Sequence, residues 1–531
     1  MHLQMRKYRN VFLSIIVLLT LIVLYGFYHT KCSVSSDSTS TFPMSLDILD
    51  GNIWLNGWIL GTNNFYFTEI VPYAIGHLLG FSSSTLLHYM SGIAWAIVFV
   101  CLLYYFDIFK TSNKKEIVIF LILVFSLLVI MPFNSMYTLL NANSHNNLYA
   151  LQLIWLLLLK QYLSKDKKIY LIAMTLLAGI MYFSESVALM SLFAPVGCVA
   201  LFRIIFQKDK KWINVLISLV VSFLLGRGIY LLFDIMGGME TRGMPMGIIT
   251  SGFMGRAKLW MDQLSVLLGC RGISISTLTP YSFFVLLVMI GLLGFLVYGC
   301  VHLAKLSWTM QICIAITLIN FLAAEFTSVA VVYRYIVPGW FFGYAALSMF
   351  VADKVSSISN KMISNILITL MTICCSWSVL EKTIQFIDAP DLDHAQKNMA
   401  DFIKEENLGN GYGDFWAASS TEYYGNYQFS VLPVKISSDS SSILTYDELI
   451  RKDWYGNENV HYIVSFSDPT TSSFIDEEQM IEILGTPDAE YDFSPYIIYY
   501  WDDDISNFLN DSFDNTSVFV DNLEVMYLKT Y

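Results

Sequence analysis

One stretch of the chain, residues 36–72, holds the side chains best suited to chemistry. Its carboxylates are, in order, Asp37, Asp47, Asp50 and Glu69. Aromatic side chains stand among them: Trp54, Trp58, Phe65, Tyr66 and Phe67. A partly buried carboxylate can take a proton from a hydroxyl or an amine, because burial raises its pKa. The stretch therefore suits a carboxylate base beside an aromatic, sugar-binding surface.

Each acidic residue of this stretch has a catalytic and a plainer interpretation. We assign Asp37 as the general base; the alternative is a solvated carboxylate in a serine-rich run. Glu69 is expected to act as a second acid, to bind the acceptor or to ligate a metal ion; alternatively it is a helix N-terminal carboxylate. Asp47 and Asp50 are expected to cap helices or face solvent. Trp58 and Tyr66 are assigned to substrate binding.

The elements that must position these residues are membrane-spanning helices. The chain has 531 residues, of which 55% are hydrophobic and 14% charged, a composition typical of polytopic membrane proteins with a soluble part. Apolar runs of about 20 residues predict eleven spans. They cover approximately residues 11–28, 84–106, 116–133, 146–163, 168–183, 186–206, 212–234, 281–303, 309–329, 335–352 and 362–380. Residues 70–79 are too few to cross and predict a re-entrant or interfacial helix. The predicted fold class is therefore mainly α, a polytopic helical bundle.

Lysine and arginine residues occur in alternate loops, and this distribution predicts the orientation in the membrane. The positive-inside rule assigns those loops to the cytoplasm. The N-terminus is then cytoplasmic. The first outer loop is 29–69, a second large outer loop is 235–280, and everything after Lys382 lies outside.

Residues 384–531 form a second unit of opposite charge. They contain 28 acidic and 6 basic residues, whereas residues 1–383 contain 15 acidic and 25 basic ones. A helix over 390–406 and strands at 460–466 and 496–501 predict a soluble α/β domain outside the membrane. Such an acidic surface argues against nucleic acid as a partner.

The loop 235–280 carries basic side chains on the side where they are usually scarce: Arg242, Arg256, Lys258 and Arg271. We weigh two interpretations, contact with lipid head groups and a clamp for phosphate. Residues 257–268 have amphipathic spacing and are predicted to lie on the membrane surface.

Three further polar residues lie at or inside apolar runs, where polar groups are costly unless they line a cavity. His145 lies within the polar patch 141–147 and is expected to bind phosphate, sugar or metal, or to lie near a helix N-cap. Glu185 is either a cavity-lining group or part of an interfacial turn. Arg227 is a substrate-binding candidate, with snorkelling to head groups as the alternative.

The order of these features resembles the GT-C glycosyltransferases that use polyprenyl-phosphate sugars, such as protein O-mannosyltransferases and lipid A aminoarabinose transferases. The resemblance rests on an acidic residue after the first span, on Gly51–Leu55 (GNIWL), on Tyr66–Glu69 (YFTE) with a nearby proline, and on Arg334–Pro338 (RYIVP). It covers the membrane part alone. The chain departs from the family at Ser38, where an acidic residue is frequent, and at Ile70 and Val71, where a lysine and a proline are usual.

The resemblance implies an inverting transfer of sugar from a polyprenyl-phosphate donor to a glycan, lipid or protein acceptor, on the outer side of the membrane. The leaving phosphate needs a cation, which is arginine, lysine or a divalent metal ion. Arg227, Arg256 and Arg334 are the arginines assigned to substrate binding, together with Tyr335. No cofactor is specified by the sequence.

Other functions remain open at this point. A transporter or flippase of lipid-linked sugar would need similar intramembrane charges but predicts repeat symmetry, which the sequence lacks. A polysaccharide polymerase or ligase would place its working loop late in the bundle. A sensor would need a cytoplasmic output module, and the inner loops are too short for one.

Overall fold

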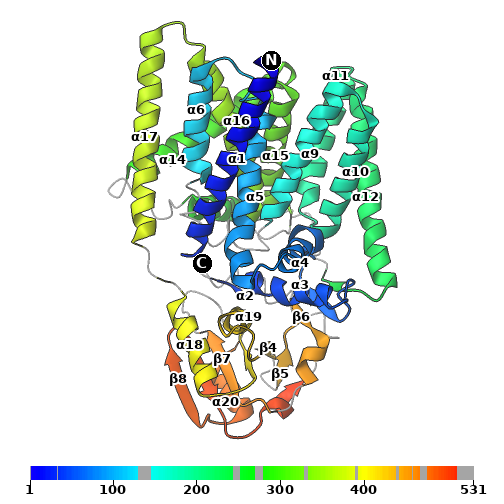
Figure 1. Cartoon of the computed structure of the whole chain (residues 1–531), viewed down its shortest axis with the longest axis vertical. Coiled ribbons are helices and arrows are strands. Elements are labelled where there is room, and N and C mark those ends of the chain that lie inside the picture. Colours follow the sequence, from blue (N-terminus) through cyan, green and yellow to red (C-terminus); the bar gives the residue numbers. More distant parts are fainter. Residues whose placement is uncertain are drawn as a thin grey trace.

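The computed structural model places an upright helical bundle above a compact C-terminal domain (Figure 1). It describes residues 2–32, 34–129, 145–242, 252–268, 279–327, 333–388, 391, 393–437, 442–456, 459–466 and 475–510. The N-terminal end of the first helix lies at the end of the bundle farthest from the C-terminal domain.

Each of the eleven apolar runs contains a helix within these described ranges. The helices are α1 (His2–His29), α5 (Ser83–Tyr105), α6 (Lys114–Val124) with η2 (Phe125–Val129), α9 (Asn146–Lys165), α10 (Lys168–Ser184), η3 (Leu189–Phe193) with α11 (Ala194–Phe206), α12 (Lys211–Ile235), α14 (Pro280–Val301), α15 (Trp308–Phe326), α16 (Tyr333–Ser356) and α17 (Lys361–Ile387). Side-chain caps define the N-terminal ends of several of these helices. Asn360 caps α17 through its side chain, and Thr279 and Ser282 form a capping box before α14.

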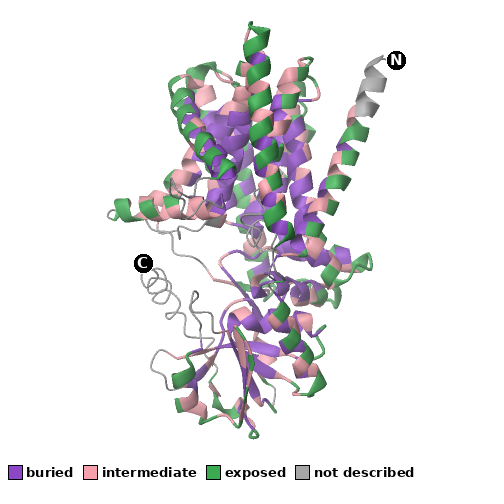
Figure 2. Ribbon diagram, turned by 90° about the vertical axis from the view of Figure 1, so that its left-hand side faces the viewer, coloured by how far each residue is buried: buried purple, intermediate pink, exposed green. Residues whose placement is uncertain are grey.

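Seven helices of the described part are long and apolar enough to cross a membrane. They fall within α1, α5, η3–α11, α12, α14, α16 and α17. Large apolar side chains are exposed on the outward faces of the bundle, while the faces between helices are buried (Figure 2). Leu224 on α12 and Leu293 on α14 are each more than 60% exposed. Such a surface is stable in lipid and not in water, so the chain is a membrane protein.

The connection from α1 to α5 forms a layer of short elements beneath the bundle (Figure 1). It comprises α2 (Ser36–Thr39), α3 (Thr41–Leu49), β1 (Trp58–Leu60), η1 (Tyr66–Ile70) and α4 (Val71–Leu78). The short helix expected near residues 70–79 is α4. The amphipathic segment expected at 257–268 belongs to α13 (Phe253–Leu267), and η5 (Leu303–Lys305) joins α14 to α15.

The C-terminal domain is a mixed α/β unit. Its helices are α18 (His394–Glu405), α19 (Phe415–Tyr424) and α20 (Glu477–Leu484), with the short turns η6 (Lys452–Gly456) and η7 (Ser506–Phe508). Its strands are β3 (Gly411–Gly413), β4 (Val431–Ile436), β5 (Ile443–Thr445), β7 (Tyr462–Phe466), β8 (Ala489–Phe493), β9 (Tyr496–Tyr500) and β10 (Leu509–Asn510). Among the described residues they form one sheet in the order β10-β5-β4-β3-β7-β9-β8. The helix and both strands expected from the sequence are present.

A second, small sheet joins the two units. Within the described chain its order is β2-β1-β6, where β2 is Glu240–Thr241 and β6 is Ile450–Arg451. β1 runs parallel to β2 and antiparallel to β6, with Ile59 paired to both Glu240 and Ile450. The sheet therefore fixes the first loop, the loop after α12 and the C-terminal domain against one another.

Candidate functional site

Asp37 lies on α2, where the chain turns beneath the end of α1. The helix is short, and Ser35 caps it by accepting a hydrogen bond from the backbone N–H of Ser38. α2 packs on α19 of the C-terminal domain, where Ser36 Oγ lies 3.4 Å from Ser420 Oγ. These contacts hold Asp37 between the bundle and the C-terminal domain.

An arginine of the bundle faces Asp37. Nη1 of Arg334, in the first turn of α16, lies 3.9 Å from Oδ2 of Asp37, whose side chain is 24% exposed. Burial raises the pKa of the Asp37 carboxyl, and the Arg334 guanidinium opposes that rise. Because its pKa is raised, Asp37 is a stronger base than a solvated carboxylate.

Glu448 of the C-terminal domain is a second carboxylate in this cluster. Burial raises its pKa to about 7, and the negative charges of Asp37 and Asp447 add to the rise. Arg242 and Arg334 oppose it. Arg334 therefore acts on both Asp37 and Glu448.

Asp447 anchors this arrangement. It is buried, and its Oδ2 pairs with Nη1 of Arg242 and lies 3.1 Å from Nζ of Lys435. Arg242 also continues the small sheet, because its backbone N–H donates to the carbonyl of Leu60 at 3.3 Å. A buried carboxylate needs such paired cations to remain ionised.

A cavity of about 710 Å³ adjoins the cluster. Arg227, Arg242 and Tyr335 contribute to its walls, and so do Asp234 and Glu240. Arg242, which pairs with Asp447, and Tyr335, which follows Arg334 in the chain, connect the cavity to the charged cluster, whereas Asp37 is not among the residues that line it. The Arg227 guanidinium lies over the ring of Tyr230 at 5.9 Å from its centroid. The cavity is of the size that binds a small molecule and combines cations with aromatic and aliphatic walls.

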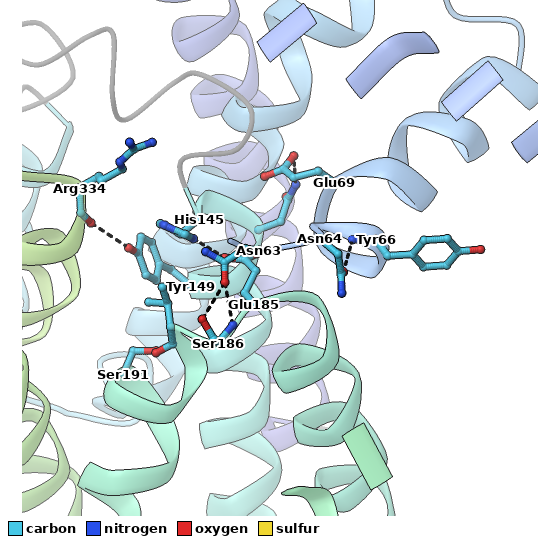
Figure 3. A network of polar contacts seen from close by, with 12 residues as sticks. Asn63, Asn64, Tyr66, Glu69, His145, Tyr149, Glu185, Ser186, Ser191 and Arg334 are labelled. Carbon is cyan, nitrogen blue, oxygen red and sulfur yellow. Dashed lines mark hydrogen bonds and ion pairs between the residues drawn. The ribbon is translucent and has the colours of Figure 1, made fainter. Parts of the chain in front are cut away.

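The first loop is clamped to the end of α10 (Figure 3). Oδ1 of Asn63 accepts hydrogen bonds from the backbone N–H and the hydroxyl of Ser186, at 2.8 and 2.9 Å. Nδ2 of Asn64 donates to the carbonyl of Phe183 at 2.7 Å, and Oγ of Ser184 accepts from the N–H of Phe67 at 3.0 Å. These bonds replace those that the backbone would lose where α10 ends.

One buried pair extends this clamp. His145 and Glu185 are buried, and Nδ1 of His145 bonds with Oε2 of Glu185. The His145 ring lies between Phe65 and Tyr335, at centroid distances of 5.6 and 5.7 Å. His145 also precedes α9 directly, with a left-handed φ of 65°. Glu185 occupies the turn after α10, so the turn and the helix start expected as alternatives are present. The binding role expected for His145 and the cavity-lining role of Glu185 stay predictions.

Glu69 lies in the first turn of η1, as its helix N-terminal interpretation expects, and is 1% exposed. Its Oε2 accepts a hydrogen bond from Nδ2 of Asn147 at 2.9 Å. The role expected for Glu69, as a second acid, an acceptor-binding group or a metal ligand, stays a prediction.

The two aromatic residues assigned to substrate binding are buried against other side chains of the protein. Trp58 is 1% exposed, meets the ring of Trp454 at 4.9 Å and donates from Nε1 to Asp47 at 2.8 Å. Tyr66 is 4% exposed and donates to the carbonyl of Ile53 at 2.7 Å, and its ring points away from His145 in Figure 3. Neither residue is among those that line the 710 Å³ cavity.

Asp47 also departs from expectation. Its Oδ1 lies 2.9 Å from Nη1 of Arg451, so it joins the first loop to β6 and does not simply cap or face solvent. Asp50 is exposed at the end of α3, as expected.

The remaining basic candidates lie apart in the fold. Arg256, on α13, donates from Nη2 to the carbonyl of Thr327 at 2.7 Å and so connects α13 to the end of α15. Arg271 and residues 141–144 of the polar patch lie outside the described residues. Within the described ranges, no group of three His, Cys, Asp or Glu side chains is arranged to hold a metal ion.

The arrangement can remove a proton at Asp37 and stabilise negative charge on a bound group through Arg334, Arg242 or Arg227. Sequence reasoning missed the contribution of Asp447 and Glu448, because they lie about 400 residues from Asp37 in an acidic domain with many similar side chains. Arg242 could have indicated these residues, because a guanidinium that is buried on folding needs an acidic partner.

No protein-family model matches this chain, and no curated protein matches it significantly in sequence.

Proposed function

We propose that the chain is an integral membrane glycosyltransferase of the GT-C type that moves a sugar from a polyprenyl-phosphate donor to a glycan, lipid or protein acceptor on the outer side of the membrane. The observation that carries this proposal is the setting of Asp37. The residue follows the first apolar helix, is 24% exposed and faces Arg334 at 3.9 Å. Tyr335, the next residue after Arg334, lines a cavity of about 710 Å³ whose walls carry two arginines.

The chemistry follows from these residues. Asp37 accepts the proton of the acceptor hydroxyl or amine while the acceptor atom bonds to the anomeric carbon. The bond from that carbon to the donor phosphate breaks, and the phosphate leaves with the electron pair. Arg334, with Arg242 or Arg227, stabilises the negative charge of the leaving phosphate. Attack opposite to the leaving group inverts the configuration of the sugar.

Transfer by purified protein from a panel of radiolabelled polyprenyl-phosphate sugars tests the proposal. Asp37→Asn preserves the shape of the side chain and removes its basicity. We expect transfer to fall by about 10²–10⁴-fold, the usual effect of a positioned base, while donor binding is retained.

The matched control is Asp50→Asn, an exposed carboxylate of the same loop. It is expected to leave transfer unchanged. Unimpaired transfer by Asp37→Asn protein would remove Asp37 from the reaction. Movement of intact donor lipid between the leaflets of a vesicle, without cleavage of the sugar bond, would support a flippase in place of a transferase.

A further inference from the structure

A second cavity, of about 640 Å³, lies where the C-terminal domain meets α1 and α5. Thr30 and Val34 follow α1, and the start of α5 contributes residues 82–84 and His88. The remaining wall comes from α18, with the residue before it, and from the end of α19, which lie beneath the ends of α1 and α5 (Figure 1). The described residues that line this cavity and the 710 Å³ cavity do not overlap, so the two spaces are separate.

Hydrogen bonds between the wall residues hold this cavity in shape. Asp393, directly before α18, accepts the backbone N–H of Val34 at 3.2 Å through both carboxylate oxygens. Its Oδ2 also accepts the hydroxyl of Tyr424 on α19 at 2.5 Å. On the opposite wall, Nδ1 of His88 lies 3.0 Å from Nδ1 of His29 on α1. The segment after α1, the start of α5 and α19 are therefore fixed around the space.

The walls carry many hydroxyl groups and few apolar side chains. Seven of the described lining residues are serine, threonine or tyrosine, and only Cys32 and Val34 are apolar. A lipid tail would find little apolar contact here. The described lining includes one carboxylate, Asp393, and one ammonium group, Lys397, so its formal charges balance and do not favour an anion. Such a cavity suits an uncharged ligand with many hydroxyl groups.

Three tyrosines at the end of α19 add aromatic rings to this wall. The rings of Tyr423 and Tyr424 meet edge to face at a centroid distance of 5.1 Å. Tyr427 is 37% exposed, and it and Asn426 have left-handed φ angles of 56° and 54°. Non-glycine residues rarely adopt this conformation, and such strain is concentrated at ligand-binding segments. Aromatic rings pack against the C–H faces of sugars, while hydroxyl and amide groups bond to sugar hydroxyls.

We propose that this cavity binds a saccharide and, on the basis of the transferase function proposed for Asp37, that the saccharide is part of a glycan acceptor. The arginines assigned to the donor phosphate line the other cavity or face Asp37, and no arginine is among the described residues of this one. Val34 precedes Asp37 by three residues, and α2, which carries Asp37, packs on α19. A sugar in this cavity is therefore held by the elements that also position the base.

Saccharide binding by the full-length protein in detergent tests the site without transfer. The probes are maltotetraose, cellotetraose, mannotetraose and N-acetylchitotetraose, titrated and observed by saturation-transfer difference NMR. We expect at least one of them to bind. Tyr427→Asn removes the ring, and asparagine tolerates the left-handed φ, so the Kd should rise by up to about tenfold. Phe508→Asn, at an exposed ring of the C-terminal domain that lines neither cavity, is the control and should leave the Kd unchanged.

Ser84→Trp provides a second variant. Ser84 is exposed at the start of α5, so a larger side chain there should fill the cavity without disturbing buried packing, and probe binding should be lost. Circular dichroism and gel filtration check that both variants fold. Equal binding by the wild-type protein and both folded variants, or no binding of any probe by the wild-type protein, overturns the saccharide site. Displacement of a bound probe by inorganic phosphate also overturns it, because the cavity would then be an anion site.

The kinetics of transfer test the acceptor role separately. With the acceptor varied, Tyr427→Asn should raise KM by about the factor by which it raises the Kd of the probe, while kcat and donor binding stay near their wild-type values. An unchanged KM alongside weakened saccharide binding overturns the acceptor role. Saccharide binding without any transfer by the wild-type protein overturns the transferase proposal and still supports the saccharide site.

Discussion

At the scale of single residues, the charge of Asp37 is determined by two opposing effects. Burial raises its pKa, and the nearby Arg334 guanidinium lowers it. A base must be ionised to act, so transfer should fall as the pH drops through the pKa of Asp37. The position of this acid limb therefore reports the balance between burial and the arginine.

Arg334→Gln tests that balance. Removing the cation leaves burial unopposed, so the pKa of Asp37 rises and the acid limb of the rate profile moves to higher pH. Donor binding should also weaken, because one phosphate partner is lost. The measurement is transfer rate against pH at saturating donor, with Lys404→Gln on α18 as the control. An acid limb that stays in place would show that Arg334 does not act on Asp37.

At the scale of elements, α19 supports the site from below and contains a buried carboxyl group of its own. Glu422 is 8% exposed, and its Oε1 accepts the N–H of Val431 at 2.8 Å. Burial raises the pKa of Glu422 to about 8. The folded protein therefore holds a proton that the unfolded chain has already released, so this stabilising contribution is complete below about pH 4.5 and is lost as the pH rises through about 8.

Glu422→Gln should remove that dependence on pH. We expect the variant to gain stability over wild type at pH 9, by roughly 1.4 kcal/mol for each unit by which the pKa of Glu422 is raised, and to differ little at pH 5. Hydrogen exchange of α19 and β4 amides in the full-length protein measures the effect. The exposed Glu478→Gln provides the comparison. Equal loss of protection in wild type and Glu422→Gln on raising the pH would show that another group titrates.

At the scale of the whole molecule, the N-terminal end of α1 and the C-terminal domain lie at opposite ends of the bundle (Figure 1). Together with the alternation of basic loops, this arrangement predicts a cytoplasmic N-terminus and a C-terminal domain outside. A reporter that is active only in the cytoplasm should be silent when fused after Tyr531 and active when inserted at Asn113, between α5 and α6. Activity of the Tyr531 fusion would place the Asp37 cluster on the cytoplasmic side.

The sequence by itself determined the features that depend on local composition and periodicity. A run of about 20 apolar residues can satisfy its backbone in lipid only as a helix, so every apolar run predicted a helix that the structure contains. Asp37 and Arg334 were likewise identified from residue type and position, because each is a charged residue next to a predicted span. The number of helices that cross the membrane stays a prediction, with seven of the described helices long and apolar enough.

Only the tertiary structure determined which charged side chains lie close to one another. Asp447 and Glu448 resemble many other acidic residues of the C-terminal domain, and only the pairing of β1 with β6 brings them to Arg242 and Asp37. The same pairing buries Trp58 against Trp454, although an aromatic residue in an outer loop had suggested contact with sugar. Strand pairing between residues 400 positions apart leaves no periodic signal in either segment, because each strand is only two or three residues long. The contacts of the candidate site were therefore fixed by long-range packing, whereas Asp37, the proposed base, was selected from local sequence.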